Sequence, residues 1–297
     1  MTEHNQWEVD MRDLAGKVAV ITGAASGMGR AMVRKAASEG MHVLAGDIDE
    51  AGLAETVGGL ENAQLMLTDV TSPDANEALA NAAMERFGGI HLVHLNAGVL
   101  TGGFTWENTV DDWRWVLDVN LWGVIHGVRS FVPRMLEKGE DGHVVITASV
   151  GGLTSGGLLG PYTTSKYGAV AIAEALHREL HMIGAPIGVS CLCPGPVATG
   201  IFRAERNRPD TYDDTCGPMS ADAEAAAFHT TLINAIDEGT DPAQIPELVF
   251  DAVRDDKFWI FPHPDFKERI AARTESIINE TNPEYTVGVP GTMPPSR

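Results

Sequence analysis

Three residues of this chain could together transfer a proton: Tyr162, Lys166 and Ser149. Tyr162 and Lys166 are one helical turn apart, so a helix through them would place the phenol and the ammonium on one face. An ammonium beside a phenol favours the phenolate and lowers a tyrosine pKa that is usually roughly 10. Ser149 follows an apolar run and could bind a substrate oxygen beside the phenol. Because Tyr-x-x-x-Lys also occurs by chance in many helices, the surrounding elements must support this interpretation.

A glycine-rich turn near the N-terminus predicts a dinucleotide site. Residues 18–22 are apolar and β-branched, as in a buried parallel strand. They lead directly into Gly23-Ala24-Ala25-Ser26-Gly27-Met28-Gly29 and then into a helical stretch. Glycines at such a turn let the backbone approach a ligand, and the N–H groups of the helix can bind pyrophosphate. The spacing Gly-x-x-x-Gly-x-Gly differs from the usual Gly-x-Gly-x-x-Gly.

A carboxylate at the end of the second apolar run favours NAD over NADP. Asp47 follows residues 42–46, where a carboxylate can accept hydrogen bonds from both ribose hydroxyls and repels a 2′-phosphate. The next residues, Ile48 and Asp49, are not basic, and Arg30 is expected to lie too far along the first helix. The alternative interpretation of Asp47 is a turn residue at a strand end.

These motifs together resemble the short-chain dehydrogenase/reductase family, over residues 14–200. The resemblance includes the glycine loop, the pair Asp69 and Val70, the run Asn96-Ala97-Gly98, Asn120, the Ser149–Tyr162–Lys166 set and residues 194–199. One departure is Leu95, where the family usually has the first Asn of Asn-Asn-Ala-Gly. We expect this change to alter sheet packing rather than chemistry.

The resemblance implies a role for each residue of the site. Tyr162 would be the general base for alcohol oxidation or the general acid for ketone reduction, and Lys166 would hold the nicotinamide ribose. Ser149 would polarise the substrate oxygen, and Asn120 would anchor a water of a proton relay beside the lysine. The residues expected to bind the cofactor are Gly23, Ser26, Gly27, Met28, Gly29, Asp47, Ile48, Asp69, Val70, Asn96, Ala97, Gly98, Tyr162, Lys166, Pro194, Gly195, Val197 and Thr199.

Strand-like and helix-like segments alternate along the chain, which favours an α/β fold with a parallel sheet covered on both faces. The strand candidates centre on residues 18–21, 42–45, 64–67, 91–95, 143–147, 188–192 and 258–261. The resemblance implies a Rossmann-type, doubly wound sheet of seven strands. We predict one domain, 1–297, with residues 200–246 as a substrate-binding lid and 282–297 as an irregular tail.

Composition excludes several classes of protein. The 297 residues include 21 Lys and Arg against 41 Asp and Glu, and the net charge of −20 would repel nucleic acid.

The sequence contains no apolar stretch of about eighteen residues, the length that predicts a membrane span, and residues 1–13 lack the apolar core of a signal peptide. Three cysteines do not make a secreted disulfide framework, so a reducing cytoplasm is the expected location. Cys191 and Cys193 are interpreted as core residues of a strand, and no metal is predicted.

The residues near Ser149 predict a roomy, uncharged pocket. The run 151–159 is made of small and apolar residues, which suits a cyclic or aromatic substrate. The lid residues Phe202, Tyr212, Met219 and Phe228 could line this pocket or could dock the lid on the core. The predicted function is therefore an NAD-dependent oxidoreductase that interconverts a secondary alcohol and a ketone.

Two alternatives remain open at the level of the sequence. One is an NADPH-dependent carbonyl reductase. The other is a non-catalytic dinucleotide sensor or scaffold, which would need neither Tyr162 nor Lys166. The expected partner is a small-molecule alcohol or ketone, and the resemblance also implies a homodimer or homotetramer.

Overall fold

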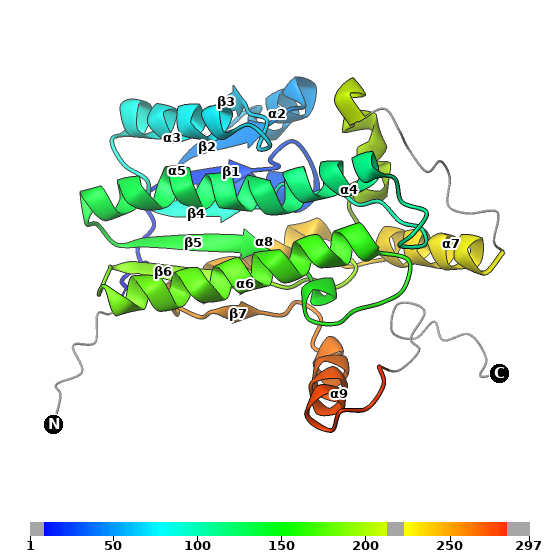
Figure 1. Ribbon diagram of the computed structural model, residues 1–297. Coiled ribbons are helices and arrows are strands. Elements are labelled where there is room, and N and C mark those ends of the chain that lie inside the picture. The colour runs from blue at the N-terminus through cyan, green and yellow to red at the C-terminus, as the bar shows by residue number, and fades with distance from the viewer. Residues whose placement is uncertain (1–8, 213–222, 284–297) are drawn as a thin grey trace, which may run out of the picture.

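A seven-stranded parallel sheet forms the centre of the molecule (Figure 1). The computed structural model describes residues 9–212 and 223–283. The strand order is β3-β2-β1-β4-β5-β6-β7, and every neighbouring pair is parallel. The strands are β1 (Val18–Thr22), β2 (His42–Asp47), β3 (Ala63–Leu67), β4 (Leu92–Leu95), β5 (Gly142–Thr147), β6 (Ile187–Leu192) and β7 (Trp259–Ile260). The predicted doubly wound α/β fold is confirmed, with its change of direction between β1 and β4.

Helices cover both faces of the sheet. In Figure 1, α4, α5 and α6 lie in front of the strands and α8 lies behind them; α3 packs on α5, and α1 packs on α2 and α8. The α-helices are α1 (Gly27–Ser38), α2 (Glu50–Val57), α3 (Pro73–Phe87), α4 (Val110–Leu117), α5 (Gly123–Lys138), α6 (Gly160–Met182), α7 (Ala223–Asp237), α8 (Ile245–Arg254) and α9 (Phe266–Ile278). Short helical turns are the π-helical η1 (Asp118–Trp122) and the 3₁₀ turns η2 (Val150–Gly152), η3 (Ile201–Asn207), η4 (Asp210–Tyr212) and η5 (Pro242–Gln244).

Two apolar layers, one on each face, hold the helices to the sheet. Strands β1, β4, β5 and β6 are buried at every residue, which explains why they appear in the sequence as continuous apolar runs. Phe131 and Ala173 belong to one layer, and Met32 and Val249 belong to the other.

Leu95 packs within the first of these layers. It is buried, and a Cβ at Gly127 of α5 would overlap its Cδ2 atom. Glycine at position 127 therefore leaves room for the leucine. The departure from the family motif is accommodated by packing, and its neutrality for the chemistry stays a prediction.

The described parts of the segment predicted as a lid are helical. They comprise η3, η4, η5 and α7, while residues 213–222 and most of the predicted tail (284–297) lie outside the described ranges. Within residues 9–212 and 223–283, none of the helices combines the length and the apolar character needed to span a membrane.

Candidate active site

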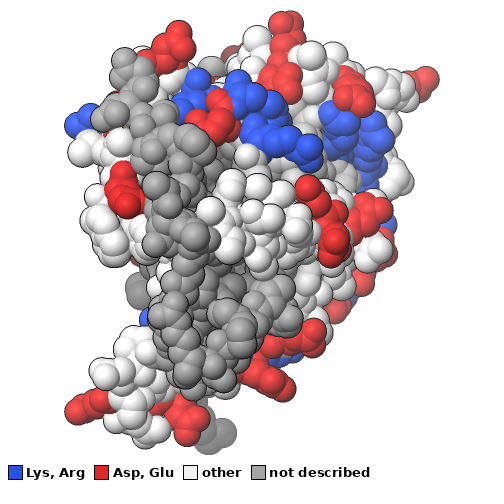
Figure 2. All heavy atoms as spheres, turned by 90° about the vertical axis from the view of Figure 1, so that its right-hand side faces the viewer, with Lys and Arg blue, Asp and Glu red and all other residues white. Residues whose placement is uncertain are grey.

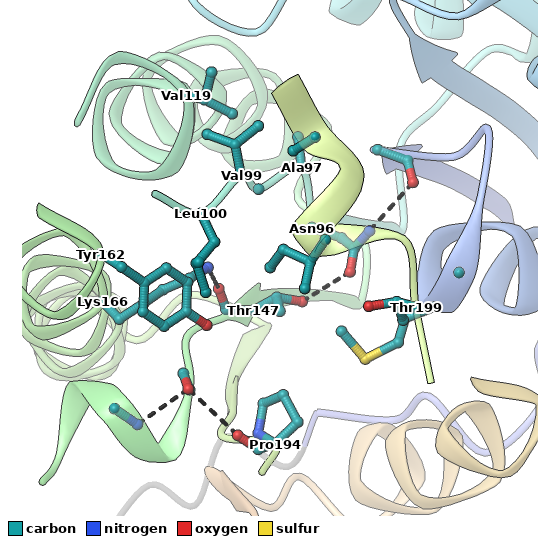
Figure 3. Close-up of a pocket in the computed structure, with 18 of the residues that line it drawn as sticks. Asn96, Ala97, Val99, Leu100, Val119, Thr147, Tyr162, Lys166, Pro194 and Thr199 are labelled. Atoms are coloured by element: carbon teal, nitrogen blue, oxygen red, sulfur yellow. Dashed lines mark hydrogen bonds between the residues drawn. The ribbon is translucent and has the colours of Figure 1, made fainter. Parts of the chain in front are cut away.

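A cavity opens at the carboxyl ends of β1 and β4, where the strand order changes direction (Figure 3). Of the predicted catalytic residues, Ser149, Tyr162 and Lys166 line it and Asn120 does not. Of the predicted cofactor residues, the lining contains Gly23, Ser26, Gly27, Met28, Asp47, Ile48, Asp69, Val70, Asn96, Ala97, Gly98, Tyr162, Lys166, Pro194, Gly195, Val197 and Thr199, but not Gly29. The fold thus brings residues from both halves of the chain to one place.

The loop between β1 and α1 requires glycine for its shape. Gly23 and Gly27 have φ of +64° and +52°, a region that favours glycine. A Cβ on Gly29 would overlap the carbonyl oxygen of Gly23, so Gly29 supports the loop from behind. Ser26 makes no side-chain cap at the start of α1, so the first N–H groups of that helix remain available to an anion. The loop therefore fits the pyrophosphate of a dinucleotide.

Basic side chains gather beside this loop although the chain as a whole is acidic. Figure 2 looks onto this edge of the sheet and shows Lys and Arg collected in the upper part of the face. Arg30, Arg34 and Arg203 line a groove that shares Gly27 and Thr199 with the cavity. Asp237 and Asp241 line the same groove, and Arg30 and Arg203 pair with Glu55 and Asp237, so these arginines are largely balanced by carboxylates.

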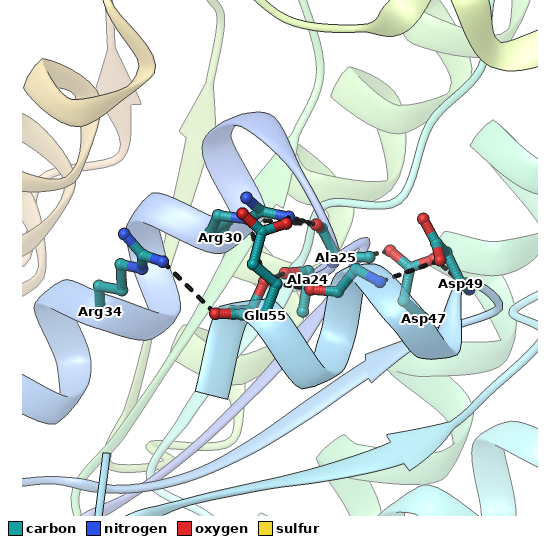
Figure 4. Close-up of polar contacts among 9 residues, drawn as sticks. Ala24, Ala25, Arg30, Arg34, Asp47, Asp49 and Glu55 are labelled. Atoms are coloured by element: carbon teal, nitrogen blue, oxygen red, sulfur yellow. Dashed lines mark hydrogen bonds and ion pairs between the residues drawn. The ribbon is translucent and has the colours of Figure 1, made fainter. Parts of the chain in front are cut away.

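Asp47 ends β2 next to the glycine loop (Figure 4). Its carboxylate accepts hydrogen bonds from the backbone N–H of Ala25 (2.9 Å) and of Asp49 (3.0 Å). Arg30 donates instead to the Ala25 carbonyl (2.6 Å) and pairs with Glu55 (2.9 Å). The guanidinium therefore reaches the glycine loop, contrary to the expectation that Arg30 lies too far along the helix, but its partners hold it outside the cavity lining.

Asn96 links the ends of three strands. Its Nδ2 donates to the Thr22 carbonyl (3.1 Å), and its Oδ1 accepts from the hydroxyl of Thr147 (3.2 Å). The Thr147 carbonyl in turn accepts a hydrogen bond from Nζ of Lys166 (2.9 Å). Thr147 was not predicted as a site residue, because in the sequence it is simply the last residue of a buried strand.

Helix α6 places Tyr162 and Lys166 on the same face, as their spacing predicted (Figure 3). Nζ of Lys166 lies 5.8 Å from the centroid of the phenol ring. Ser149 accepts a hydrogen bond from the N–H of Gly151 (3.0 Å). A Cβ at Gly151 would lie 3.4 Å from the Ser149 hydroxyl and 3.5 Å from the Tyr162 ring, so the two side chains are close neighbours.

Burial controls the charge states of these groups. It raises the pKa of Tyr162, against an opposing effect of the hydrogen bond with Ser149, and it lowers the pKa of Lys166 to about 8. The direction for Tyr162 is opposite to the sequence prediction, because the ammonium is directed at the Thr147 carbonyl and the phenol is desolvated. The chain by itself therefore keeps Tyr162 as a protonated phenol.

Asn120 lies behind the cavity, in the π-helical turn η1. It is fully buried; its Oδ1 accepts from the N–H of Val99 (2.8 Å), and its Nδ2 donates to the Val99 carbonyl (2.9 Å) and to Ser165 (3.0 Å). A Cβ at Gly98 would lie 3.5 Å from this Oδ1 and 3.6 Å from Nζ of Lys166. Asn120 thus fastens the β4 loop to α6 at a point near the lysine.

The outer part of the cavity is mostly apolar and comes partly from the segments 151–159 and 200–246, which the sequence marked, and partly from segments that it did not. These lining residues are Val99, Leu100, Trp115, Val119, Leu159, Ile201, Ala204, Leu232, Ile236 and Phe266, with Arg206 and Arg269 as charged members. Half of the apolar residues precede β6 and half follow it, so the wall forms only when the segments after β6 pack against the earlier ones, which no local pattern predicts.

Of the four residues expected either to line the pocket or to dock the segment 200–246 on the core, Tyr212 does both. It lines the cavity, and its hydroxyl donates to Asp118 (2.8 Å). Phe202 packs against Leu158 and Leu232. Met219 and the side chain of Phe228 lie outside the described residues.

Arg208 anchors the segment after β6 to α4. Its Nη1 lies 2.7 Å from Oδ1 of Asp112, and the two side chains are only 5% and 2% exposed. The guanidinium also lies over the Trp115 ring, 5.1 Å from its centroid, and donates to the Tyr212 carbonyl (2.7 Å). One side chain therefore joins η4, α4 and an apolar cluster.

Arg208→Met is expected to lower the free energy of unfolding by about 3 kcal/mol, because it removes this cation from a buried carboxylate. Urea unfolding followed by circular dichroism measures the change. The control is Arg203→Met, whose pair with Asp237 (3.7 Å) is exposed and should contribute less than about 1 kcal/mol. Equal losses in the two variants would contradict the anchoring role.

The cysteines of β6 lie in the core. Cys191 and Cys193 are buried free thiols whose Sγ atoms are 3.7 Å apart. In the part of the chain that the structure describes, no three His, Cys, Asp or Glu side chains lie together in a way that could hold a metal ion.

Residues 17–210 match the family model described as short chain dehydrogenase. The chain belongs to the short-chain dehydrogenase/reductase family. It is therefore an oxidoreductase of a family that acts on CH–OH groups and binds a nicotinamide dinucleotide.

Relatives and solved structures of the family match nearly the whole chain. A CLA biosynthesis dehydrogenase/reductase of Lactiplantibacillus plantarum is 30% identical, over 93% of this chain and 98% of the relative. A 1-deoxy-11-beta-hydroxypentalenate dehydrogenase of Streptomyces avermitilis is 35% identical, over 86% and 88%. The crystal structure of a short-chain dehydrogenase/reductase from Burkholderia phymatum in complex with NAD is 40% identical, covers 94% of this chain and 100% of that chain, and superposes with a TM-score of 0.89.

Proposed function

We propose that this family member is an NAD-dependent dehydrogenase that interconverts a secondary alcohol and a ketone. The observation that carries the proposal is that Ser149, Tyr162 and Lys166 line the same cavity as the glycine loop and Asp47. Bound NAD would supply the hydride chemistry. The chain would supply the binding site, the orientation of the substrate and the path of the proton.

Tyr162 is the proposed acid and base. Together, the hydroxyls of Ser149 and Tyr162 would hold the substrate oxygen. The phenol would give its proton to a ketone, and the phenolate would take one from an alcohol. Since the buried phenol is protonated in the chain alone, a positive charge brought beside it would be needed to favour the phenolate.

Lys166 and Asn120 support the acid and base in this proposal. Lys166 would hold the nicotinamide ribose by exchanging or sharing its bond to the Thr147 carbonyl. Asn120 uses both N–H donors of its amide and one lone pair of its oxygen on Val99 and Ser165. The second lone pair would be available to a water beside Lys166.

The preference for NAD is supported by the charges around Asp47. Asp47 lines the cavity next to Ile48, whereas Arg30 is engaged with Ala25 and Glu55. A 2′-phosphate would therefore meet a carboxylate without an arginine to neutralise it.

The proposed substrate carries its CH–OH or ketone on a cyclic or aromatic body. The mostly apolar wall of the cavity supports this, since Leu159, Ile201 and Leu232 offer apolar contacts to such a body, beside the two charged lining residues Arg206 and Arg269. The proposal extends to a homodimer or homotetramer built through α5 and α6, which size-exclusion chromatography with light scattering would test. A cytoplasmic location remains a prediction from cysteine usage.

The test follows the absorbance of reduced nicotinamide with purified protein, NAD or NADP, and a panel of cyclic, benzylic and aliphatic secondary alcohols. Turnover with NAD and cyclic or benzylic alcohols is expected. A preference for NADP would instead favour the carbonyl reductase. Tight NAD binding without any turnover would favour the sensor or scaffold.

A further inference from the structure

His263 contacts the loop after β6 without belonging to any recognised motif of the site. It lies between β7 and α9, and its Nδ1 is 3.0 Å from the backbone nitrogen of Gly195, which donates to it. On the other side of the ring, Nε2 is 3.0 Å from Oγ1 of Thr240. One imidazole thus joins two backbone segments at the edge of the cavity.

The loop and the ring are packed directly against each other. A Cβ on Gly195 would lie 3.0 Å from Cγ of His263 and 2.7 Å from Cε2 of Phe266. Thr240 extends the contact, because its N–H donates to the Pro196 carbonyl (3.1 Å) and its carbonyl accepts from the N–H of Ala198 (2.9 Å). His263 therefore holds residues 195–198 both directly and through Thr240.

These hydrogen bonds require a neutral ring. An N–H donor at Gly195 needs a lone pair on Nδ1, and the proton of the ring is then on Nε2, where it can be donated to Thr240. Burial lowers the pKa of His263, which favours this form, while a hydrogen bond with the backbone of Pro196 and, after it, the charge of Asp265 act in the opposite direction. The packed segments carry further charged residues, which are Glu238 and Asp241 beside Thr240 and Lys267, Glu268, Arg269, Arg273 and Glu275 on α9.

We propose that His263 is a positioning residue that holds residues 194–199 in the conformation that binds the nicotinamide end of the cofactor, and that protonation of its ring loosens that end. The inference rests on the proposed function, because it assigns this loop to the nicotinamide. The new element is that Nδ1 of His263, an acceptor outside the cavity lining, controls how tightly the nicotinamide half of the dinucleotide binds. The adenosine half, held by Asp47 and the glycine loop, does not depend on it.

Two amide substitutions separate the two nitrogens of the ring. In His263→Asn the amide oxygen takes the place of Nδ1 and can still accept from Gly195. In His263→Gln the amide reaches only the place of Nε2, so the Gly195 N–H loses its acceptor. Calorimetry of NAD binding at pH 7.5 is expected to show a Kd within about twofold of the wild type for the Asn variant, and about tenfold weaker binding for the Gln variant.

ADP-ribose is the matched ligand, because it has the adenosine, the pyrophosphate and the second ribose but no nicotinamide. Its Kd is expected to be the same, within about twofold, in the wild type and both variants. Equal weakening of NAD and ADP-ribose in the Gln variant would mean general damage to the site and would overturn the inference. So would equal NAD affinities in the Asn and Gln variants.

The pH dependence is a second readout that a purely structural role would not change. The conformation of residues 194–199 that binds NAD favours the neutral ring. NAD should therefore bind with full affinity above the ordinary histidine pKa of about 6.5. As the pH falls below that value, binding should weaken by up to about tenfold per pH unit. The Asn variant should lose this dependence, whereas the control His42→Asn, an exposed histidine at the start of β2, should keep it. An unchanged pH dependence in the Asn variant would overturn the inference alone. If the wild type bound neither NAD nor ADP-ribose, the proposed function would be overturned and the inference with it.

Discussion

Tyr162→Phe is expected to lower kcat/KM for the best alcohol by on the order of 1,000-fold, because it removes one hydroxyl, the proposed proton donor and acceptor. The ring itself remains, so its packing beside Gly151 and Lys166 is kept. The Kd of NAD should therefore change by less than about threefold. Steady-state kinetics and calorimetry on the same preparation measure the two quantities.

The matched control is Tyr167→Phe, which removes a phenol hydroxyl from the next residue of α6. Tyr167 does not line the cavity, so this variant should keep its kcat/KM within about twofold. A Tyr162→Phe enzyme with a tenth or more of the wild-type activity would exclude Tyr162 as the acid and base. Equal losses in both variants would indicate damage to α6 rather than loss of a proton path.

Asp47→Ala is expected to reduce the ratio of kcat/KM for NAD to that for NADP by on the order of 100-fold. Two effects add: the ribose hydroxyls lose a charged acceptor, and a 2′-phosphate no longer meets a carboxylate at close range. Parallel kinetics with both cofactors and one alcohol measure the ratio.

Asp49→Ser provides the control for Asp47→Ala. Asp49 caps α2 by accepting from the N–H of Gly52 (3.0 Å), and serine is also a good cap. The variant thus removes a neighbouring negative charge while keeping the helix start, and the cofactor ratio should change by less than about threefold. A ratio that is unchanged in Asp47→Ala would return Asp47 to the alternative interpretation, a turn residue at a strand end.

Much of the site could be predicted because its motifs sit at strand ends. The runs predicted at 42–45 and 143–147 became β2 and β5 with small changes at their ends, and the residues just beyond them line the cavity. In a parallel sheet all carboxyl ends lie on one edge, so residues that follow successive strands must be neighbours. Gly29 and Asn120 show the limit of this rule, since both support the cavity from behind without lining it.

By itself, the sequence determined the alternation of strands and helices, the glycine loop and the one-turn spacing of Tyr162 and Lys166, because strand and helix periodicity and turn residues act locally. The doubly wound sheet was implied by the resemblance of these motifs to a known family. Only the tertiary structure decided the charge state of Tyr162, the buried ion pair of Arg208 with Asp112, and the contact of His263 with Gly195. Each of these joins residues that are far apart in the chain. Desolvation of a phenol and the burial of an ion pair depend on what closes over them, and that is set by how the segments after β6 pack back onto the sheet.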